Sequence, residues 1–203
     1  MTTIRQFTKT YPTVSSVEVN SADDTFVWMG YQVDDGVCHL QKTSMYDLNS
    51  VYYDIELTVN AILDIKVVGT YVYVLHDITS SILASYFTVA NPLVDAYELA
   101  FPRVLQENPV AVGADSSDNI FVLLPGSLSS LNASILYFDY SGVFIEEIDL
   151  GESSTVVNDA SSMIIDDNDV IWITTNTIPA NLVKVWYDGA LSIWRYVVTQ
   201  MTP

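Results

Sequence analysis

The segment Val170-Ile171-Trp172-Ile173 is wholly apolar and directly follows a short turn of Asp and Asn residues. Three other apolar segments also follow a turn: Phe26-Val27-Trp28-Met29, Tyr71-Val72-Tyr73-Val74 and Ile120-Phe121-Val122-Leu123. The first residues of the four segments are separated by 45, 49 and 50 positions. Recurrence at a period of roughly 40–50 residues is typical of propellers and other repeat proteins, so this repeat predicts the fold.

The composition of the 203-residue chain predicts one folded domain. Half of the residues are hydrophobic and 16% are charged, whereas disordered chains are poor in apolar residues. The 25 acidic and 7 basic side chains give a net charge of −18, which repels phosphate backbones, so we expect no nucleic-acid partner. No apolar run approaches the roughly 18 residues that span a bilayer. The start also lacks the apolar region of a secretory signal, so we expect no membrane insertion.

Each of the four units is predicted to contain four short strands bounded by Gly, Pro, Asn, Asp and Ser. The quoted segments are the second strands, and their continuous apolar character predicts burial on both faces. The other strands are expected at 16–20, 64–68, 110–114 and 162–165 (first), 38–43, 82–88, 134–140 and 182–187 (third), and 51–57, 96–101, 143–150 and 191–198 (fourth). Ser141-Gly142 and Asp188-Gly189 are predicted to form two-residue hairpin turns.

Sixteen strands in four antiparallel sheets match the blades of a β-propeller. We therefore predict an all-β, four-bladed β-propeller in a single domain, 1–203, with blades at about 13–59, 60–106, 107–153 and 154–203. Residues 1–12 are expected to form an extra strand or arm that closes the ring or pairs with another subunit. One alternative is a β-sandwich or solenoid. Another is a ring in which two chains each supply half of an eight-bladed dimeric propeller.

The last two units carry a family resemblance. Residues 162–175 read SMIIDDNDVIWITT, residues 182–189 read LVKVWYDG, and the third unit repeats the pattern with DNIFV at 118–122 and FDYSG at 138–142. This pattern resembles the propeller repeats of NHL-type, two-component-sensor and streptogramin-lyase-type families. The first two units lack the Gly that follows the third strand. The resemblance implies a propeller over nearly the whole chain but no particular activity, because one fold hosts unrelated chemistries.

Clusters of Asp precede three of the second strands, at Asp23-Asp24, at Asp115 with Asp118, and at Asp166-Asp167 with Asp169. None fits the spacing of a calcium-binding loop. Asp and Asn favour turns because their side chains bond nearby backbone amides, so we interpret these clusters as turns. A weak cation site is the alternative interpretation.

The chain offers few residues for catalysis. His39 and His76 are its only histidines and Cys38 its only cysteine. Neighbours on a strand point to opposite faces, so Cys38 and His39 are not expected to meet. We predict no catalytic residue, no metal site and no cofactor. The aromatic residues at equivalent second-strand positions, Trp28, Tyr73, Phe121 and Trp172, are expected in the core.

These observations favour a non-enzymatic module for protein–protein interaction, or a structural role in a larger assembly such as a phage virion. The expected partners are other protein subunits, including copies of this chain, and the expected location is a virion or the host cytoplasm. The alternative is a propeller enzyme of lactonase or lyase type that acts on a small molecule. Both readings place the ligand or partner face on loops after the second strands, at Tyr31, His76, Asp77 and Asn176.

Overall fold

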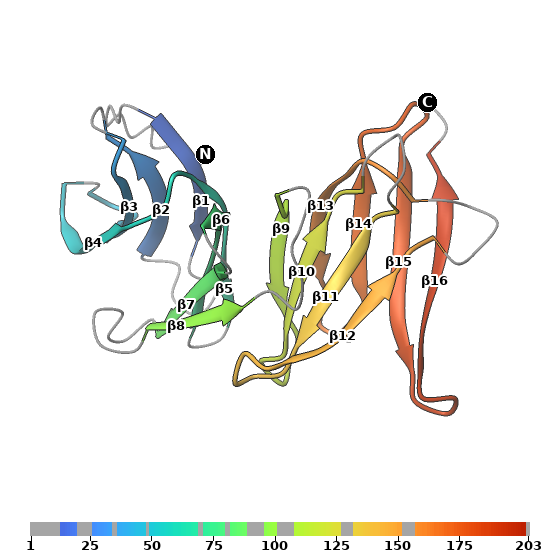
Figure 1. Cartoon of the computed structure of the whole chain (residues 1–203). Coiled ribbons are helices and arrows are strands. Elements are labelled where there is room, and N and C mark those ends of the chain that lie inside the picture. The colour runs from blue at the N-terminus through green and yellow to red at the C-terminus, as the bar shows by residue number, and fades with distance from the viewer. Residues whose placement is uncertain are drawn as a thin grey trace, which may run out of the picture.

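The computed structural model describes residues 13–19, 26–33, 36–47, 49–68, 71–79, 82–88, 96–100, 108–126, 132–151 and 157–201. These residues form sixteen β-strands and no helix (Figure 1). Accordingly, they include no helix long and apolar enough to cross a membrane. The arm expected at 1–12 lies outside the described residues.

The strands form four antiparallel sheets, each made from one predicted unit and ordered as in the sequence. The first sheet contains β1 (Thr13–Val19), β2 (Phe26–Gln32), β3 (Cys38–Ser44) and β4 (Val51–Leu57). The second contains β5 (Ile62–Val68), β6 (Tyr71–Thr79), β7 (Ile82–Thr88) and β8 (Ala96–Ala100). The third contains β9 (Ala111–Ala114), β10 (Ile120–Leu124), β11 (Ser134–Phe138) and β12 (Phe144–Asp149). The fourth contains β13 (Ala160–Ile165), β14 (Ile171–Thr175), β15 (Asn181–Asp188) and β16 (Ile193–Gln200).

The predicted two-residue hairpin turns are wrong. Residues 139–143 separate β11 from β12, and residues 189–192 separate β15 from β16. Gly142 does take a positive φ of 80°, whereas in the second turn Ser192 takes it, with φ 54°, in place of Gly189. The Asp139 side chain explains the longer first turn, because its Oδ1 accepts hydrogen bonds from the backbone amides of Ser141 and Val143.

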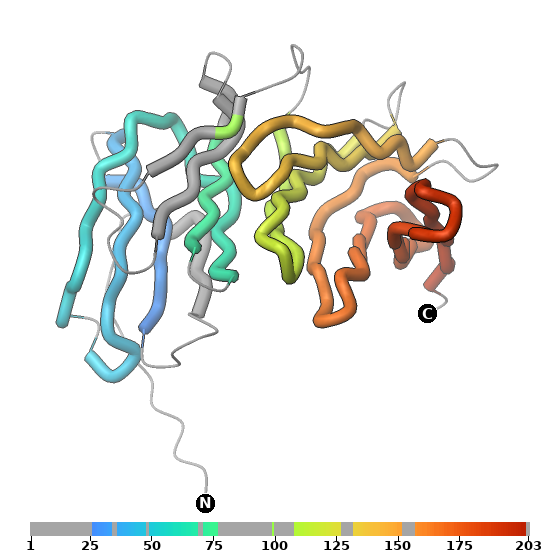
Figure 2. Tube along the Cα trace, turned by 90° about the horizontal axis from the view of Figure 1, so that it is seen from below, coloured from blue at the N-terminus to red at the C-terminus, as the bar shows by residue number. Residues whose placement is uncertain are grey.

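The sheets stack side by side in chain order, as Figures 1 and 2 show. The first strand of each sheet contacts the first strand of the next, so that β1 meets β5, β5 meets β9, and β9 meets β13. Among the described strands, no comparable contact joins the fourth sheet to the first. The described part of the chain therefore forms an arc, and the closure expected of a four-bladed ring is not seen in it.

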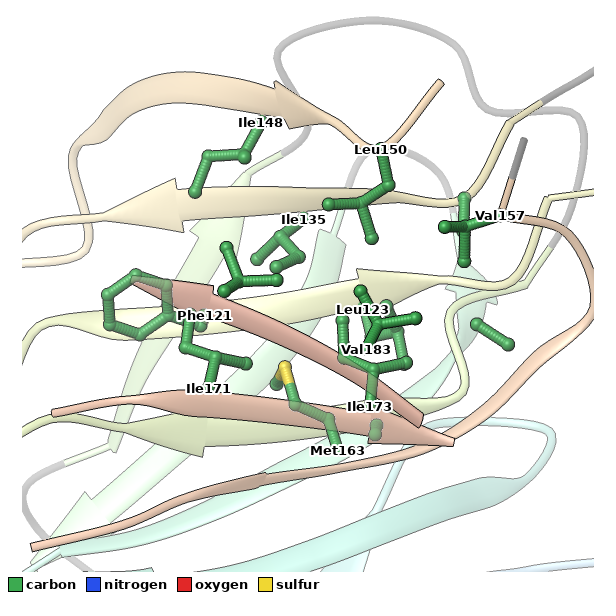
Figure 3. Packing of buried hydrophobic residues seen from close by; sticks show 14 residues of the cluster. Phe121, Leu123, Ile135, Ile148, Leu150, Val157, Met163, Ile171, Ile173 and Val183 are labelled. Carbon is green, nitrogen blue, oxygen red and sulfur yellow. The ribbon is translucent and has the colours of Figure 1, made fainter. Parts of the chain in front are cut away.

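Three clusters of buried side chains fill the spaces between successive sheets. Trp28 and Leu40 of the first sheet pack against Ile65 and Val72 of the second. A second cluster joins the second and third sheets, and includes Tyr73 and Val122. The cluster between the third and fourth sheets is shown in Figure 3. Burying such apolar surface contributes about 25 cal/mol per Å², so these contacts between sheets stabilise the stack.

Burial of the second strands depends on the position of the sheet in the arc. Every residue of β10 is buried, whereas burial in β14 alternates between buried and half-buried residues. The prediction that Trp28, Tyr73 and Phe121 lie in the core is confirmed, since each is at most 2% exposed. It is wrong for Trp172, which is half-buried because no other sheet of the described residues covers its face of the fourth sheet.

We call this face the open face. Strand register places its residues in rows: Ile164 pairs with Trp172, Trp172 with Lys184, and Lys184 with Val197. Leu182, Trp186 and Arg195 lie on the same face, because they are an even number of residues from members of these rows. Ile164 is 56% exposed and Val197 is 48% exposed.

Candidate functional site

The four residues predicted for a ligand face are spread over three sheets. Tyr31 on β2 is 7% exposed, and its hydroxyl lies 3.2 Å from Asp54 Oδ2. His76 on β6 is 2% exposed. Asp77 is also on β6, but its side chain is outside what the structure describes. Asn176 is exposed directly after β14.

Three of these residues nevertheless lie at the same end of their sheets. In the first, second and fourth sheets, the pairing between the first and second strands contains a register shift. The second-strand residues paired at this shift are Tyr31, His76 and Thr175. Tyr31 and His76 are therefore equivalent positions of successive sheets, and Asn176 is one residue beyond the third equivalent position. They share an edge of the arc but do not form one cluster.

A polar network occupies the face of the first sheet that points away from the second sheet. Asp54 accepts hydrogen bonds from the Tyr31 hydroxyl and from Gln41 Nε2, and its Oδ1 lies 2.9 Å from His39 Nδ1. The Tyr31 and His39 rings stack with centroids 5.1 Å apart. Cys38 is fully buried in the cluster on the opposite face. The prediction that Cys38 and His39 do not meet is confirmed.

The acidic turns of the third and fourth sheets are Asx turns. Asp115 Oδ1 accepts hydrogen bonds from the amides of Ser117 and Asn119. Asp166 Oδ1 accepts the equivalent bonds from Asn168 and Val170. These contacts support the turn interpretation, because the carboxylates are used by the backbone. Among the described residues, no group of three or more acidic, His or Cys side chains could hold a metal ion.

A cavity among the described residues lies between the third and fourth sheets. Its volume is about 440 Å³, and we call it the aromatic pocket. It is lined by Asp115, Phe121, Tyr137, Ile145, Glu146, Asp169, Tyr187 and Trp194. A smaller groove of about 190 Å³ follows β5, β9 and β13, and is mainly apolar.

Strand register brings the lining residues of the aromatic pocket together. Phe121, Tyr137 and Glu146 form one row across β10, β11 and β12. Tyr187 and Trp194 are paired across β15 and β16. Because neighbours on one face of a sheet stand about 5 Å apart, each sheet presents a continuous aromatic wall to the pocket.

The rings contact one another in defined orientations. Phe121 and Tyr137 stack with centroids 4.9 Å apart and planes 5° apart. Trp194 meets both of them edge-on, with centroids 5.7 and 5.8 Å away. Tyr187 meets Trp194 at 5.3 Å. Such aromatic pairs contribute about 0.5–1.5 kcal/mol each beyond area burial, so the walls are preorganised.

Carboxylates surround these rings. Glu146 Oε1 accepts a hydrogen bond of 2.8 Å from Trp194 Nε1, which links the third sheet to the fourth. Asp169 accepts hydrogen bonds from the backbone amide and hydroxyl of Ser116, which links the two acidic turns. Burial raises the pKa of Tyr137, and the charges of Asp115, Glu146 and Asp139 raise it further. The pocket is therefore an electronegative environment in which the Tyr137 hydroxyl stays protonated.

This combination of groups is suited to a cation. The faces of Trp, Tyr and Phe rings attract ammonium and guanidinium groups, and aromatic cages are a known means of binding quaternary ammonium ligands. The described lining residues include three carboxylates and no Lys, Arg or His. The net charge of −18 adds a long-range attraction for cations.

Sequence reasoning did not find the aromatic pocket. It assigned Phe121 to the core and did not single out Tyr137, Glu146, Tyr187 or Trp194 for binding. These residues come from outer strands of two different units, and only the register and stacking of the sheets brings them together. The available signal was the recurrence of aromatic residues in the third and fourth strands of the last two units.

No family model matches the sequence, and no curated protein matches it. Solved structures of β-propeller proteins do match the fold. Hydrazine synthase from Kuenenia stuttgartiensis matches with a TM-score of 0.65 and 11% identity, over 93% of this chain and 54% of that chain. The WD40 domain of Neurospora crassa Pan2 matches with a TM-score of 0.60 and 16% identity, over 93% and 50%.

A putative 6-phosphogluconolactonase from Bacteroides uniformis matches with a TM-score of 0.54 and 10% identity, over 96% of this chain and 74% of that chain. The chain thus spans about half the length of the first two proteins. The four sheets have the stacking of β-propeller blades, as the repeat pattern predicted. At these identities the likeness shows the fold alone. The comparisons give no support to a virion location.

Proposed function

We propose that the chain is a non-enzymatic β-propeller module whose four sheets are successive blades, and that the aromatic pocket binds a cationic group of a partner protein. The ligand class is an ammonium or guanidinium group, as carried by lysine, methylated lysine or arginine side chains. The observation that carries the proposal is a cavity of about 440 Å³ lined by four aromatic rings and three carboxylates.

Two features of the pocket support recognition over catalysis. Its acidic groups are already held by hydrogen bonds, as Glu146 is by Trp194 and Asp169 by Ser116. Its described lining contains neither a Ser nor a Cys nucleophile and no His to activate one, which are the groups most often used in acyl transfer. Preorganised rings and fixed charges instead favour reversible binding.

We do not extend the proposal to a lactonase or lyase activity. Such an enzyme would use Tyr31, His76, Asp77 and Asn176, and these residues belong to three different sheets. Tyr31 bonds to Asp54 within its own sheet. A place in a larger assembly or in a virion stays a prediction from composition.

The test compares the binding affinity of choline with that of its neutral isostere 3,3-dimethylbutan-1-ol. Calorimetry and tryptophan fluorescence measure both affinities. The two probes have the same shape, so a difference in affinity reports the charge. We expect choline to bind about tenfold or more tightly, since a desolvated cation–π contact contributes about 2 kcal/mol. Equal affinities, or no binding of choline, would contradict the proposal.

Two variants locate the binding. Tyr187→Ala removes one aromatic ring of the pocket. Because Tyr187 is 51% exposed, folding should be retained. Choline affinity should fall about tenfold. Tyr140→Ala is the matched control, because Tyr140 is 70% exposed and lies outside the pocket. Glu146→Gln keeps an acceptor for Trp194 and removes the charge, and should lower affinity for choline but not for the neutral isostere.

A further inference from the structure

The two aspartates of the aromatic pocket carry charge, but their oxygens are already engaged as hydrogen-bond acceptors. Asp115 Oδ1 accepts hydrogen bonds from the backbone amides of Ser117 and Asn119, and its Oδ2 accepts one of 2.9 Å from Asn119 Nδ2. Asp169 Oδ1 and Oδ2 accept hydrogen bonds of 2.7 and 2.8 Å from the amide and the hydroxyl of Ser116. These carboxylates therefore supply charge to the pocket more readily than they supply acceptors.

Glu146 holds the one carboxylate oxygen of the lining that has no donor among the described residues. Its Oε1 accepts a hydrogen bond of 2.8 Å from Trp194 Nε1, and Oε2 is left. With both oxygens of each aspartate, five of the six carboxylate oxygens are engaged. The other side-chain oxygens of the lining are the hydroxyls of Tyr137 and Tyr187. As neutral groups, they form weaker hydrogen bonds with a cation than a carboxylate does.

The lining of the pocket includes both buried and exposed residues. Phe121 is 2% exposed and belongs to the buried cluster between the third and fourth sheets (Figure 3). Tyr187 and Ile145 are 51% and 50% exposed. A cationic group that passes from the exposed residues to Phe121 leaves water behind. Any N–H donor that it carries then needs an acceptor inside the pocket.

Cations of biological ligands differ in the number of these donors. A lysine ammonium group has three N–H donors and an arginine guanidinium group has five, whereas a trimethylammonium group has none. The trimethylammonium group keeps the positive charge that aromatic faces attract. Its methyl groups also make apolar contacts with the rings. A pocket with fixed charges and few free acceptors therefore matches a fully methylated cation.

We propose that the aromatic pocket selects a trimethylammonium group, as carried by a trimethylated lysine, over unmethylated lysine and arginine side chains. This inference rests on the proposed function, because it specifies which cation the pocket takes. The rings make the direct contacts, and the carboxylates act as fixed negative charges around them. The engagement of the carboxylate oxygens by the chain's own donors provides the selectivity.

The first experiment measures the affinity of the full chain for three probes by calorimetry at pH 7. Choline, N,N-dimethylethanolamine and ethanolamine share one skeleton, are cations at this pH, and carry zero, one and three N–H donors on nitrogen. We expect affinity to fall along this series. Choline should bind at least about tenfold more tightly than ethanolamine, because N–H donors left without acceptors in a buried site are costly.

A pair of variants tests whether the engaged acceptors cause this selectivity. Ser116→Ala frees Asp169 Oδ2, so ethanolamine should gain affinity relative to choline by about threefold or more. Ser117→Ala is the matched control, because Ser117 donates to Asp115 only through its backbone amide, which the variant keeps. It should leave the affinity ratio unchanged. Circular dichroism checks that both variants are folded.

Trimethylammonium groups occur both on trimethylated lysine and on the choline phosphoesters of lipids, and two further probes distinguish these sources. N-acetyl-trimethyllysine methylamide has no other charge, whereas phosphocholine also carries an anionic phosphate that the carboxylates of the pocket repel. We expect the lysine derivative to bind at least about tenfold more tightly. The reverse order would overturn the assignment to a lysine side chain.

The remaining outcomes separate this inference from the proposed function. Ethanolamine that binds as tightly as choline overturns the selectivity, and the cation site stands if choline still binds more tightly than 3,3-dimethylbutan-1-ol. Equal affinities of choline and this neutral isostere overturn the proposed function, and the inference with it. An affinity ratio that Ser116→Ala does not change shows that methyl contacts alone cause the preference, which overturns the role of the engaged acceptors.

Discussion

The third and fourth sheets are copies of one repeat, yet they differ in how they are buried. In the third sheet all five residues of β10 are buried, because sheets pack on both of its faces. In the fourth sheet burial in β14 alternates between buried and half-buried residues. The two strands occupy equivalent positions, so the difference comes from the neighbours of each sheet and not from the repeat itself.

This difference shows what an apolar run does and does not predict. A continuous apolar strand indicates that both faces of its sheet are suited to burial. It does not say whether the covering sheet belongs to the same chain. Trp172 and Ile164 are of residue types that are usually buried. In the single chain, however, Trp172 is half-buried and Ile164 is exposed. Three measurements can sharpen the comparison.

The largest effect is expected from replacing a leucine by alanine, once in the third sheet and once on the open face of the fourth. Leu136→Ala in the third sheet removes a fully buried side chain and should destabilise the protein by about 2–5 kcal/mol, through lost burial and a cavity. Leu182→Ala on the open face should cost less than about 1 kcal/mol, because Leu182 is only partly buried. Urea unfolding of the two variants measures both values. Equal costs would mean that the open face is covered in solution.

A smaller effect is expected at the contact between the acidic turns. The Ser116 hydroxyl donates to Asp169 Oδ2 at 2.8 Å, whereas Ser117 uses only its backbone amide, which donates to Asp115. Ser116→Ala should cost about 0.5–1.5 kcal/mol, the net contribution of a typical intramolecular hydrogen bond. Ser117→Ala is the matched control and should be neutral. Thermal unfolding measures both, and equal shifts would show that the turns do not stabilise the contact between the sheets.

The smallest effects concern pH. Hydrogen bonds from Trp172 and from the amides of Asn168 and Val170 lower the pKa of Asp166. A lowered pKa gives stability that is present above the unfolded pKa of about 3.9 and is lost as the pH falls through the folded pKa. Asp166→Asn should therefore lower Tm at pH 7, and the difference from wild type should vanish in strong acid.

Asp118 in the third sheet should behave in the opposite way. Burial and the charge of Asp115 raise the pKa of Asp118. Its favourable contribution is present at low pH and is lost as the pH rises through the folded pKa. Asp118→Asn should therefore raise Tm slightly at pH 7, since Asn also tolerates the positive φ of 63° at this position. A decrease in Tm would contradict this assignment.

Much of the fold was accessible from the sequence because each unit carries its own strand and turn signals. The strands predicted at 51–57 and 82–88 coincide with β4 and β7. The hairpin turns were less accessible, because Asp139 bonds two amides and stabilises a longer turn than the Ser141-Gly142 pair suggests. Whether the sheets close into a ring could not be predicted from the sequence, because closure depends on contacts between sheets that no single unit encodes.

The candidate site was less predictable than the fold. Tyr31 and His76 occupy equivalent positions, but they lie within β2 and β6 and not on loops after the second strands, where the ligand face was predicted. The aromatic pocket, however, needs Tyr137 from one unit and Trp194 from the next to approach within 5.8 Å. This distance follows from the stacking of two sheets, and sequence spacing alone contains no information about it.

The contacts in chain order, from β1 to β5, β9 and β13, have a consequence for how such a chain can change over time. Among the described strands, the main contacts of each sheet are with the sheets before and after it. Gene duplication or deletion of one unit would then leave the other junctions intact. Blade number could then drift by whole units while the pocket between the third and fourth sheets is inherited unchanged.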